Sequence, residues 1–522
     1  MPDKNLPRVH GGVFYMAMID VKNLTFGYDG STENLFENCS IRIDTDWKLG
    51  LVGRNGRGKT TFLKLLKGEL LYSGHITGLT EFVSFPFEIK DTEEFASEVI
   101  SRIAPNAEDW QIRREMNLIG LSENVLYMPY CLLSGGEKTK LQLICLFLDE
   151  GRFPLIDEPT NHLDMNGREM AAAYLKKKGG FILVSHDRNF LDNCTDHTMS
   201  INRTNIDIMP VSFSLWQEEN DKKLQFEQTQ NDRLKKDIAR LKKSEETAEK
   251  WSNISESKKI GFDPRITEKS IGRRSFEGAK SKKMMKHAKT MERRFENKIE
   301  EKSSLLKNLE KREDLVITGE KHYADSLITV KDLALYYDDK QITKPMNFEI
   351  KQGMRYAITG TNGCGKSTLL KFLSGEGSPY CDSNLKKTGE VYRASGITIS
   401  YVCQDTSFLK GTLHEYALNE HVDEPRYKAI LRKMGFSKEN LDQEISSFSE
   451  GQKKCAVIAM SLCQSANLYL WDEPLNYVDV YIRQTIEEML SETDITMVFV
   501  EHDKAFVEKI ADFIIETEAF GE

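Results

Sequence analysis

A repeat of long period constrains this chain more than any other feature of its sequence. Five motifs occur twice, in the same order and at offsets between 307 and 316 residues. They are VKNLTFGY (21–28) and VKDLALYY (330–337), GRNGRGKTT (53–61) and GTNGCGKST (360–368), LSGGEKTK (133–140) and FSEGQKKC (448–455), LIDEPTNHLD (155–164) and LWDEPLNYVD (470–479), and VSHD (184–187) and VEHD (500–503). Such a repeat indicates two homologous domains. We predict them at 18–211 and 326–522, after a short extension at 1–17 and separated by a linker at 212–325.

Each half contains the pattern GxxxxGK[ST], placed between an apolar run typical of a strand and one typical of a helix. Glycines let backbone N–H groups close around phosphate oxygens, and the N-terminus of the following helix favours their negative charge. One match is compatible with an ordinary glycine-rich turn, but two matches in register predict ATP-binding loops. The predicted ATP-binding residues of these loops are Gly53, Asn55, Gly56, Gly58, Lys59, Thr60 and Thr61, and Gly360, Asn362, Gly363, Gly365, Lys366, Ser367 and Thr368.

Two carboxylates follow an apolar, strand-like run in each half. They are Asp157 and Glu158 in the first half and Asp472 and Glu473 in the second. Paired carboxylates at a strand end are often only a solvated loop, but the P-loop upstream favours a role in phosphoryl transfer. We predict that each aspartate is a Mg²⁺ ligand beside the P-loop hydroxyl, Thr60 or Ser367, and that each glutamate is catalytic and orients or activates the attacking water.

With these motifs the sequence resembles the ATP-binding cassette (ABC) superfamily over both halves. LSGGE at 133–137 resembles its signature motif, residues 161–164 and 476–479 resemble D-loops, and His186 and His502 resemble catalytic switch histidines. The resemblance implies two α/β domains in a head-to-tail sandwich, with each ATP held by one P-loop and the opposite signature. It adds these ATP-binding residues: Ser134, Gly135 and Gly136, and Ser449, Gly451 and Gln452. It also adds Tyr28 and Tyr337 as adenine-stacking aromatics, for which a place in the core is the alternative.

The second signature departs from the family pattern at Glu450, where the first half has Gly135. A carboxylate beside a phosphate is repelled unless it turns away or finds a cation such as Lys453 or Lys454. We therefore predict that the two ATP sites turn over at different rates.

The two halves also differ after the strand-like runs that precede the signature. Gln404 follows the run at 399–402, where the family's Q-loop glutamine reaches Mg²⁺, and we count it among the metal ligands. The first half has FVSFPF at 82–87 and no glutamine, so that Glu88 is the available substitute.

The linker is basic although the chain is acidic. Residues 212–322 hold 28 Lys and Arg against 21 Asp and Glu, while the whole chain has a net charge of −9. Helix-forming runs at about 215–252 and 279–314 flank a stretch with four glycine or proline residues, which predicts an all-α hairpin (a coiled coil) with an extended tip at about 252–278. Mixed signs at 215–250 indicate a solvated surface. The basic run is predicted to bind RNA through Arg273, Arg274, Lys280, Lys282, Lys283, Lys286, Lys289, Arg293 and Arg294.

No run of 18 or more apolar residues is present, and none of the nine cysteines forms a CxxC pair. These observations predict a cytoplasmic protein without transmembrane helices, a disulfide framework or a cysteine-ligated metal. We expect ATP and Mg²⁺ as the cofactors, no DNA or membrane partner, and a monomer in which the two cassettes pair within the chain.

Paired cassettes joined by a basic helical hairpin resemble the ABC-F family of translation factors. FSEGQKKC, WDEPLNYVD, the glutamine-free FPF and the lengthened tip resemble its antibiotic-resistance branch, of the Lsa, Vga and Sal type. The resemblance implies binding to the bacterial 70S ribosome, with the linker near 23S rRNA and the peptidyl-site tRNA. It also implies displacement of lincosamide, pleuromutilin and streptogramin A drugs. The alternatives are a housekeeping ABC-F factor that acts on stalled ribosomes and the ATPase subunit of a membrane drug exporter.

Overall fold

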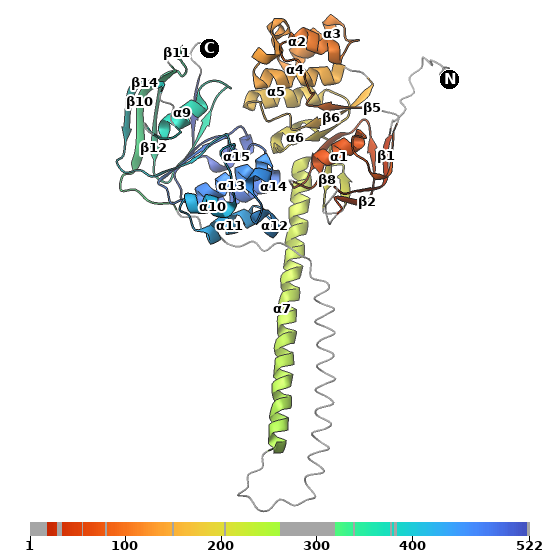
Figure 1. Ribbon diagram of the computed structural model, residues 1–522, viewed down its shortest axis with the longest axis vertical. Helices are drawn as coiled ribbons and strands as arrows, with labels where there is room; N and C mark the ends of the chain where they lie inside the picture. The colour runs from red at the N-terminus through yellow and green to blue at the C-terminus, as the bar shows by residue number, and fades with distance from the viewer. Residues whose placement is uncertain are drawn as a thin grey trace, which may run out of the picture. The chain divides into compact units, whose positions relative to one another are not determined.

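The computed structural model describes residues 18–28, 34–54, 56–78, 81–148, 151–202, 205–260, 319–337, 340–375, 378–380 and 384–518. The first cassette, up to Trp216, and the second cassette, from Glu313, form one compact unit, and residues 217–312 of the linker belong to another. Figure 1 labels their helices and strands.

The first cassette contains three-stranded and six-stranded sheets. Its strands are β1 (Met18–Phe26), β2 (Phe36–Asp44), β3 (Lys48–Val52), β4 (Ser73–Thr77), β5 (Glu81–Phe85), β6 (Arg152–Asp157), β7 (Phe181–Val184), β8 (His197–Ile201) and β9 (Ile206–Met209). Its helices are α1 (Lys59–Leu66), α2 (Ala96–Ile103), α3 (Asp109–Ile119), α4 (Gly135–Leu148), α5 (Met165–Lys176) and α6 (Arg188–Cys194), with 3₁₀ turns η1 (Glu123–Tyr127) and η2 (Tyr130–Leu132).

The second cassette repeats this arrangement with four-stranded and five-stranded sheets. Its strands are β10 (Ser326–Tyr337), β11 (Lys340–Gln341), β12 (Met346–Lys351), β13 (Arg355–Thr359), β14 (Leu385–Arg393), β15 (Ile399–Val402), β16 (Leu468–Asp472), β17 (Met497–Val500) and β18 (Phe513–Glu516). Its helices are α9 (Lys366–Leu373), α10 (Leu413–Asn419), α11 (Glu424–Lys433), α12 (Lys438–Leu441), α13 (Glu450–Cys463), α14 (Val480–Ser491) and α15 (Lys504–Ile510), with the 3₁₀ turn η3 (Ile445–Ser447).

Strand order confirms the predicted α/β fold with two tandem P-loop domains. The larger sheet of the first cassette has the order β5-β6-β7-β3-β8-β9, and that of the second has β15-β16-β17-β13-β18. The shared five strands are parallel in both sheets. Strands β16 and β17 are buried along their whole length, as expected for parallel strands covered on both faces. Each P-loop follows the carboxyl end of β3 or β13, and each carboxylate pair follows the carboxyl end of β6 or β16, with one strand between them in the sheet. Both therefore lie at the sheet edge where ligands bind in such folds.

Helix α7 (Phe213–Ile260) forms the first arm of the linker. It starts close to the predicted position but continues past Ser252, so the helix occupies the beginning of the tip predicted at about 252–278. The physical reason is compositional, since no glycine or proline interrupts the chain before Gly261. The rest of that tip and the second predicted arm lie outside the described residues.

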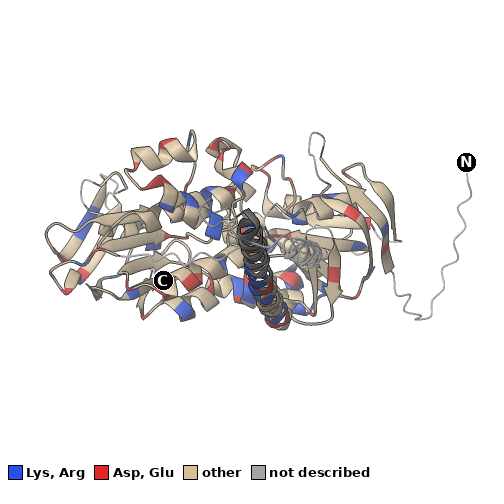
Figure 2. Ribbon diagram, turned by 90° about the horizontal axis from the view of Figure 1, so that it is seen from below, with Lys and Arg blue, Asp and Glu red and all other residues tan. Residues whose placement is uncertain are grey.

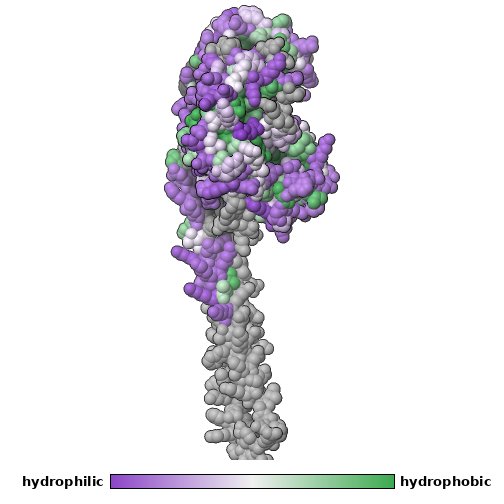
Figure 3. All heavy atoms as spheres, turned by 90° about the vertical axis from the view of Figure 1, so that its left-hand side faces the viewer, coloured by the Kyte–Doolittle hydropathy of each residue, from purple (hydrophilic) through white to green (hydrophobic). Residues whose placement is uncertain are grey.

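Hydrophilic side chains cover most of the face shown in Figure 3, including the described part of α7. Acidic and basic residues are interspersed along the ribbon of both cassettes (Figure 2). Within the parts of the chain that the structure describes, no helix is long and apolar enough to cross a membrane.

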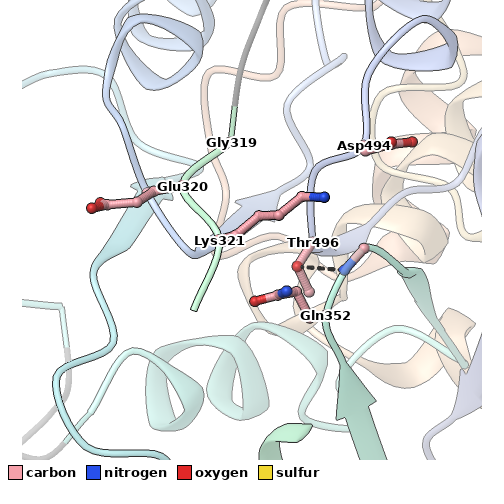
Figure 4. Close-up of a pocket in the computed structure, with 8 residues that line it drawn as sticks. Gly319, Glu320, Lys321, Gln352, Asp494 and Thr496 are labelled. Carbon is pink, nitrogen blue, oxygen red and sulfur yellow. Dashed lines mark hydrogen bonds between the residues drawn. The ribbon is translucent and has the colours of Figure 1, made fainter. Parts of the chain in front are cut away.

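A polar cavity of about 140 Å³ lies where the linker re-enters the second cassette. Figure 4 shows it between residues 319–321, Gln352, Asp494 and Thr496, with the amide N–H of Gly353 donating a hydrogen bond to Thr496 Oγ1 at 2.9 Å. None of the predicted nucleotide residues lines this cavity.

Candidate nucleotide sites

Each P-loop joins a buried strand to the N-terminus of a helix, as predicted. Gly58 and Gly365 cap α1 and α9 with φ of 89° and 93°, a conformation that a side chain disfavours. The ammonium groups of the two lysines lie inside their own loops. Lys59 Nζ donates to Gly53 O at 2.8 Å, and Lys366 Nζ donates to Gly360 O at 2.9 Å. Burial lowers the pKa of Lys59, although the carboxylates of Asp479, Glu158 and Asp157 oppose the shift.

The structure brings the other predicted loop residues to the same two places. Gly56 and Gly363 have φ of 79° and 84°, and Thr61 is buried behind its loop, next to Tyr28. Thr368 follows Ser367 in the first turn of α9. Asn55 lies outside the described residues.

The predicted Mg²⁺ ligands form matching pairs. Thr60 Oγ1 donates to Asp157 Oδ2, and Ser367 Oγ donates to Asp472 Oδ1, both at 2.9 Å. Burial raises the pKa of both aspartates, that of Asp472 to about 6. A hydroxyl beside a carboxylate is an oxygen donor set that suits Mg²⁺. No group of three or more His, Cys, Asp and Glu that could hold a metal occurs in the described chain, so Mg²⁺ would also need phosphate oxygens here.

Both predicted catalytic glutamates have a backbone conformation that is uncommon for their residue type. Glu158 and Glu473 have φ of 51° and 46°. Their amide groups donate to Val184 O at 2.9 Å and to Val500 O at 3.1 Å, across the neighbouring strands β7 and β17. Strain of this kind persists only where surrounding structure enforces it, and it concentrates at functional sites.

In the second cassette the glutamate is held by three side chains. Gln404 Nε2 and Asn476 Nδ2 each donate to Glu473 Oε2 at 2.7 Å, and His502 Nε2 lies 3.5 Å from Oε1. Burial alone would raise the pKa of Glu473, but the hydrogen bonds from His502 and Asn476 and the charge of Lys366 outweigh it, so the pKa is lowered. Gln404 thus contacts the predicted catalytic carboxylate, and its role as a metal ligand stays a prediction.

The first cassette lacks that support. Among the described residues, Glu158 Oε1 is buried without a hydrogen-bond partner, although His186 Nε2 lies 3.3 Å away. Burial, with the charge of Asp157, raises the pKa of Glu158 to about 8. Burial and the charge of Lys59 hold the pKa of His186 well below its usual value. The first cassette therefore presents a neutral histidine and a largely protonated glutamate near pH 7.

The segment of the first cassette that corresponds to the Q-loop contains no glutamine, and a glutamine from another element contacts it. Gln142, from α4, accepts a hydrogen bond from the Phe87 amide at 3.0 Å and donates to Tyr130 Oη at 2.8 Å. Glu88 is exposed, and none of its described contacts reaches Asp157 or Glu158. Glu88 therefore does not replace the missing glutamine in this structure.

Both signature serines cap the helix that follows them. Ser134 exchanges hydrogen bonds with Glu137, and Ser449 does so with Gln452. Glu450 turns away from the helix end: it accepts from Lys453 Nζ at 2.8 Å and from Thr406 Oγ1 at 3.0 Å. Glu450 is therefore paired with Lys453, one of the two lysines that the sequence suggested as its partner. Gly135 and Gly136 lie against His162, and Gly451 is buried in the first turn of α13.

The first D-loop and the segment that follows the second one make contacts between the cassettes near the nucleotide loops. Asn362, in the second P-loop, donates through its amide N–H to Asp164 Oδ2 and through Nδ2 to His162 O, both at 3.2 Å. At the other site, Val480 and Tyr481 line a cavity of about 10 Å³ together with Lys59 and His186. No described contact joins Ser134 or Ser449 to the opposite P-loop, so the predicted signature contacts stay predictions.

Of the two predicted adenine-stacking tyrosines, Tyr28 has a described contact with its nucleotide loop. Tyr28 is 52% exposed, and its hydroxyl forms a hydrogen bond with Thr61 Oγ1 at 2.9 Å. Tyr337 ends β10, opposite Lys340 and Leu385. Tyr337 is half-buried, and neither tyrosine is among the buried core residues, so adenine stacking by either one stays a prediction.

Sequence reasoning missed two buried ion pairs that hold each D-loop to its own switch segment. Arg168 donates to Asp187 Oδ2 at 2.9 Å and to Leu163 O at 3.1 Å. Arg483 donates to Asp503 Oδ2 at 3.0 Å and to Val478 O at 2.9 Å. Both arginines lie four residues after the last D-loop aspartate, so a comparison of the two halves of the repeat could have identified them.

These differences sharpen the prediction of unequal sites. In a Glu473→Gln protein, hydrolysis at the first site should rise roughly tenfold between about pH 7 and pH 9, because Glu158 must lose its proton to serve as a base. In a Glu158→Gln protein, hydrolysis at the second site should be nearly flat, because the lowered pKa keeps Glu473 ionised. Steady-state phosphate release over this range measures both, and superimposable profiles would contradict the prediction.

A profile of the ABC transporter family matches residues 36–161 and 343–476, one match in each cassette. The chain therefore contains two tandem ABC ATP-binding domains, in agreement with the motifs and the fold.

Several curated proteins align with nearly the whole chain, and they point to one family within the proteins that have ABC domains. ATP-binding protein Uup of Buchnera aphidicola is 26% identical and covers 95% of this chain and 80% of its own. Ribosome protection protein VmlR of Bacillus subtilis is 24% identical (94% and 86%), and ABC transporter F family member 5 of Arabidopsis thaliana is 25% identical (96% and 75%). These relatives support the ABC-F family predicted from the sequence. Among solved structures, the archaeal ribosome recycling factor aABCE1 shares the fold, with a TM-score of 0.61, 19% identity, and 96% and 88% of the two chains covered.

Proposed function

We propose that this protein is an ATP-hydrolysing ABC-F protein that binds the 70S ribosome and protects it from drugs of the peptidyl-transferase centre. The observation that supports the proposal is the presence of two P-loop sites in one chain with a long helix, α7, that begins in the first cassette. Because the first D-loop contacts the second P-loop, and the start of α14 lines a cavity with Lys59 of the first, ATP binding at either site would affect the contact between the cassettes.

The proposed chemistry uses the residues already placed. The P-loop amides and Lys59 or Lys366 would bind the phosphates, and Thr60 with Asp157, and Ser367 with Asp472, would hold Mg²⁺. When bound, Mg²⁺ offsets the negative charge that develops on the transferred phosphoryl group. Glu158 and Glu473 would orient the attacking water and accept its proton, with His186 and His502 beside them. Hydrolysis would then weaken the contact between the cassettes and release the protein.

The finer proposal concerns the linker. The basic residues at 273–294 would contact 23S rRNA and the peptidyl-site tRNA, so that α7 and its continuation shift the tRNA end and the drug leaves. VmlR, named a ribosome protection protein, supports this proposal because it aligns with nearly the whole chain. The Lsa, Vga and Sal branch remains part of the proposal, on the motifs quoted above.

In vitro translation tests the proposal. Adding the protein with ATP should restore synthesis that is inhibited by a lincosamide, a pleuromutilin or a streptogramin A drug, and it should not restore synthesis inhibited by a drug of the decoding site. No restoration with any of the three classes would overturn the protective role.

A general translation factor is the second candidate. Uup, whose name mentions no drug, is as similar to this chain as VmlR. This candidate predicts relief of stalled ribosomes in drug-free extract. An exporter ATPase instead predicts lower drug accumulation in cells and no effect on translation in vitro.

A further inference from the structure

Glu487 is a fully buried carboxylate at the contact between the two cassettes. It lies on α14 and is 0% exposed, and it accepts hydrogen bonds from Arg188 of the first cassette through both carboxylate oxygens. Lys509, from α15 of its own cassette, donates to Glu487 Oε2 at 3.0 Å. Two cations from different cassettes therefore share one buried anion.

The two helices that carry this ion pair also carry nucleotide-site residues. Arg188 begins α6 and is two residues beyond the switch histidine, His186. Helix α14 begins at Val480, directly after the D-loop, and Val480 packs in the apolar core of the first cassette beside Lys59. The ion pair thus fastens the middle of α14 to the segment whose histidine faces Glu158.

The corresponding contact on the other side of the interface is much weaker. Lys504 occupies in VEHDK the place that Arg188 occupies in VSHDR. Its ammonium lies 3.6 Å from Glu169 of the first cassette, and both side chains are more than half exposed. Exposed pairs of this kind contribute little, whereas a buried carboxylate depends strongly on its partners.

We propose that Arg188 is a positioning residue, whose ion pair with Glu487 makes hydrolysis at the Lys59 site depend on docking of the second cassette's D-loop helix. The proposal rests on the proposed function in assigning hydrolysis to Glu158 and Glu473. Separating the cassettes would leave Glu487 with Lys509 alone, so the ion pair favours the docked arrangement. Because Lys504 offers only a loose equivalent, the Lys366 site lacks this dependence.

Site-isolated kinetics test the proposal. In the Glu473→Gln protein, Arg188→Met should lower kcat by roughly three- to thirtyfold with little change in KM, the range expected when a coupling contact is lost. In the Glu158→Gln protein, the same substitution should change kcat by less than about twofold. Lys504→Met is the matched control and should leave both backgrounds unchanged. Arg188→Lys, which keeps a charge at this position, should restore part of the loss.

Amide hydrogen exchange measures the effect of the Arg188–Glu487 ion pair on the two helices that it joins, and this measurement does not depend on ATP hydrolysis. Arg188→Met should lower amide protection in α6 and α14 by about tenfold or more, while Lys504→Met leaves both helices unchanged. Lys509 still balances Glu487 in the variant, so the fold should persist, and a single cooperative thermal unfolding transition checks this.

The outcomes separate the two proposals. Equal kinetic losses in both backgrounds, or unchanged protection of α6 and α14, would overturn the role of Arg188. If neither single glutamate variant lowers hydrolysis, the proposed catalytic roles fail, and the exchange experiment still decides the role of Arg188.

Discussion

A protein with both Glu158→Gln and Glu473→Gln should hydrolyse ATP at least about 100-fold more slowly than the wild type and should sediment with ribosomes when ATP is present. Glutamine keeps the size of each side chain but cannot accept a proton from water, and proton transfer of this kind contributes about 10²- to 10⁴-fold to rate. Binding of ATP should persist, because the P-loops are unchanged. The cassettes would then stay paired, and the protein would remain bound.

Phosphate release and co-sedimentation with and without ATP measure these effects. Glu88→Gln with Glu492→Gln is a matched control, because it removes the same charge from two exposed positions. Wild-type hydrolysis by the double catalytic variant would show that neither carboxylate takes part. Slow hydrolysis without ATP-dependent retention on ribosomes would separate the ATPase from the proposed partner.

Neutralising the basic run should have the second large effect. Replacing Arg273, Arg274, Lys280, Lys282, Lys283, Lys286, Lys289, Arg293 and Arg294 by Gln should weaken ribosome binding by at least about 100-fold and flatten its dependence on salt, because each lost phosphate contact no longer releases counterions. ATP hydrolysis without ribosomes should stay within about twofold of the wild type, since the nucleotide sites lie in the cassettes. Filter binding across a salt series measures the affinity.

The described helix offers a control for total charge. Lys222, Lys223, Arg233, Lys235 and Lys236 are exposed on α7. Changing these residues to Gln should leave binding nearly unchanged, because their neighbours of opposite sign make this surface a solvated one. An equal loss from both sets would show that net charge alone, and not the basic run, attracts the ribosome.

The repeat was sufficient to predict the fold and most of each nucleotide site. Motifs at fixed offsets had to occupy equivalent strands, and the order β5-β6-β7-β3-β8 recurs as β15-β16-β17-β13-β18. The pairing of Thr60 with Asp157 and of Ser367 with Asp472 also followed, because a P-loop hydroxyl and a strand-end carboxylate meet at the same sheet edge.

Other features depend on distances that no motif contains. The orphaned oxygen of Glu158 and the three supports of Glu473 arise from the local packing of each cassette, so two identical DE pairs differ in protonation. The pair of Arg188 with Glu487 joins residues 299 positions apart on helices outside every motif. The end of α7 was predicted too early, at about Ser252, although the first glycine of the predicted tip is Gly261 and the helix continues to Ile260.

The root of α7 has a mechanical consequence. Its first turn is embedded in the first cassette through Phe213 and Trp216, and the Trp216 ring lies 6.5 Å from that of Tyr481 at the start of α14. The helix is then unbroken for 48 residues, which corresponds to about 70 Å. In a straight helix of that length, a change of direction of about 5° corresponds to a displacement of about 6 Å between its two ends. The length of α7 alone therefore makes a small angle equivalent to a distance of about the size of a nucleobase.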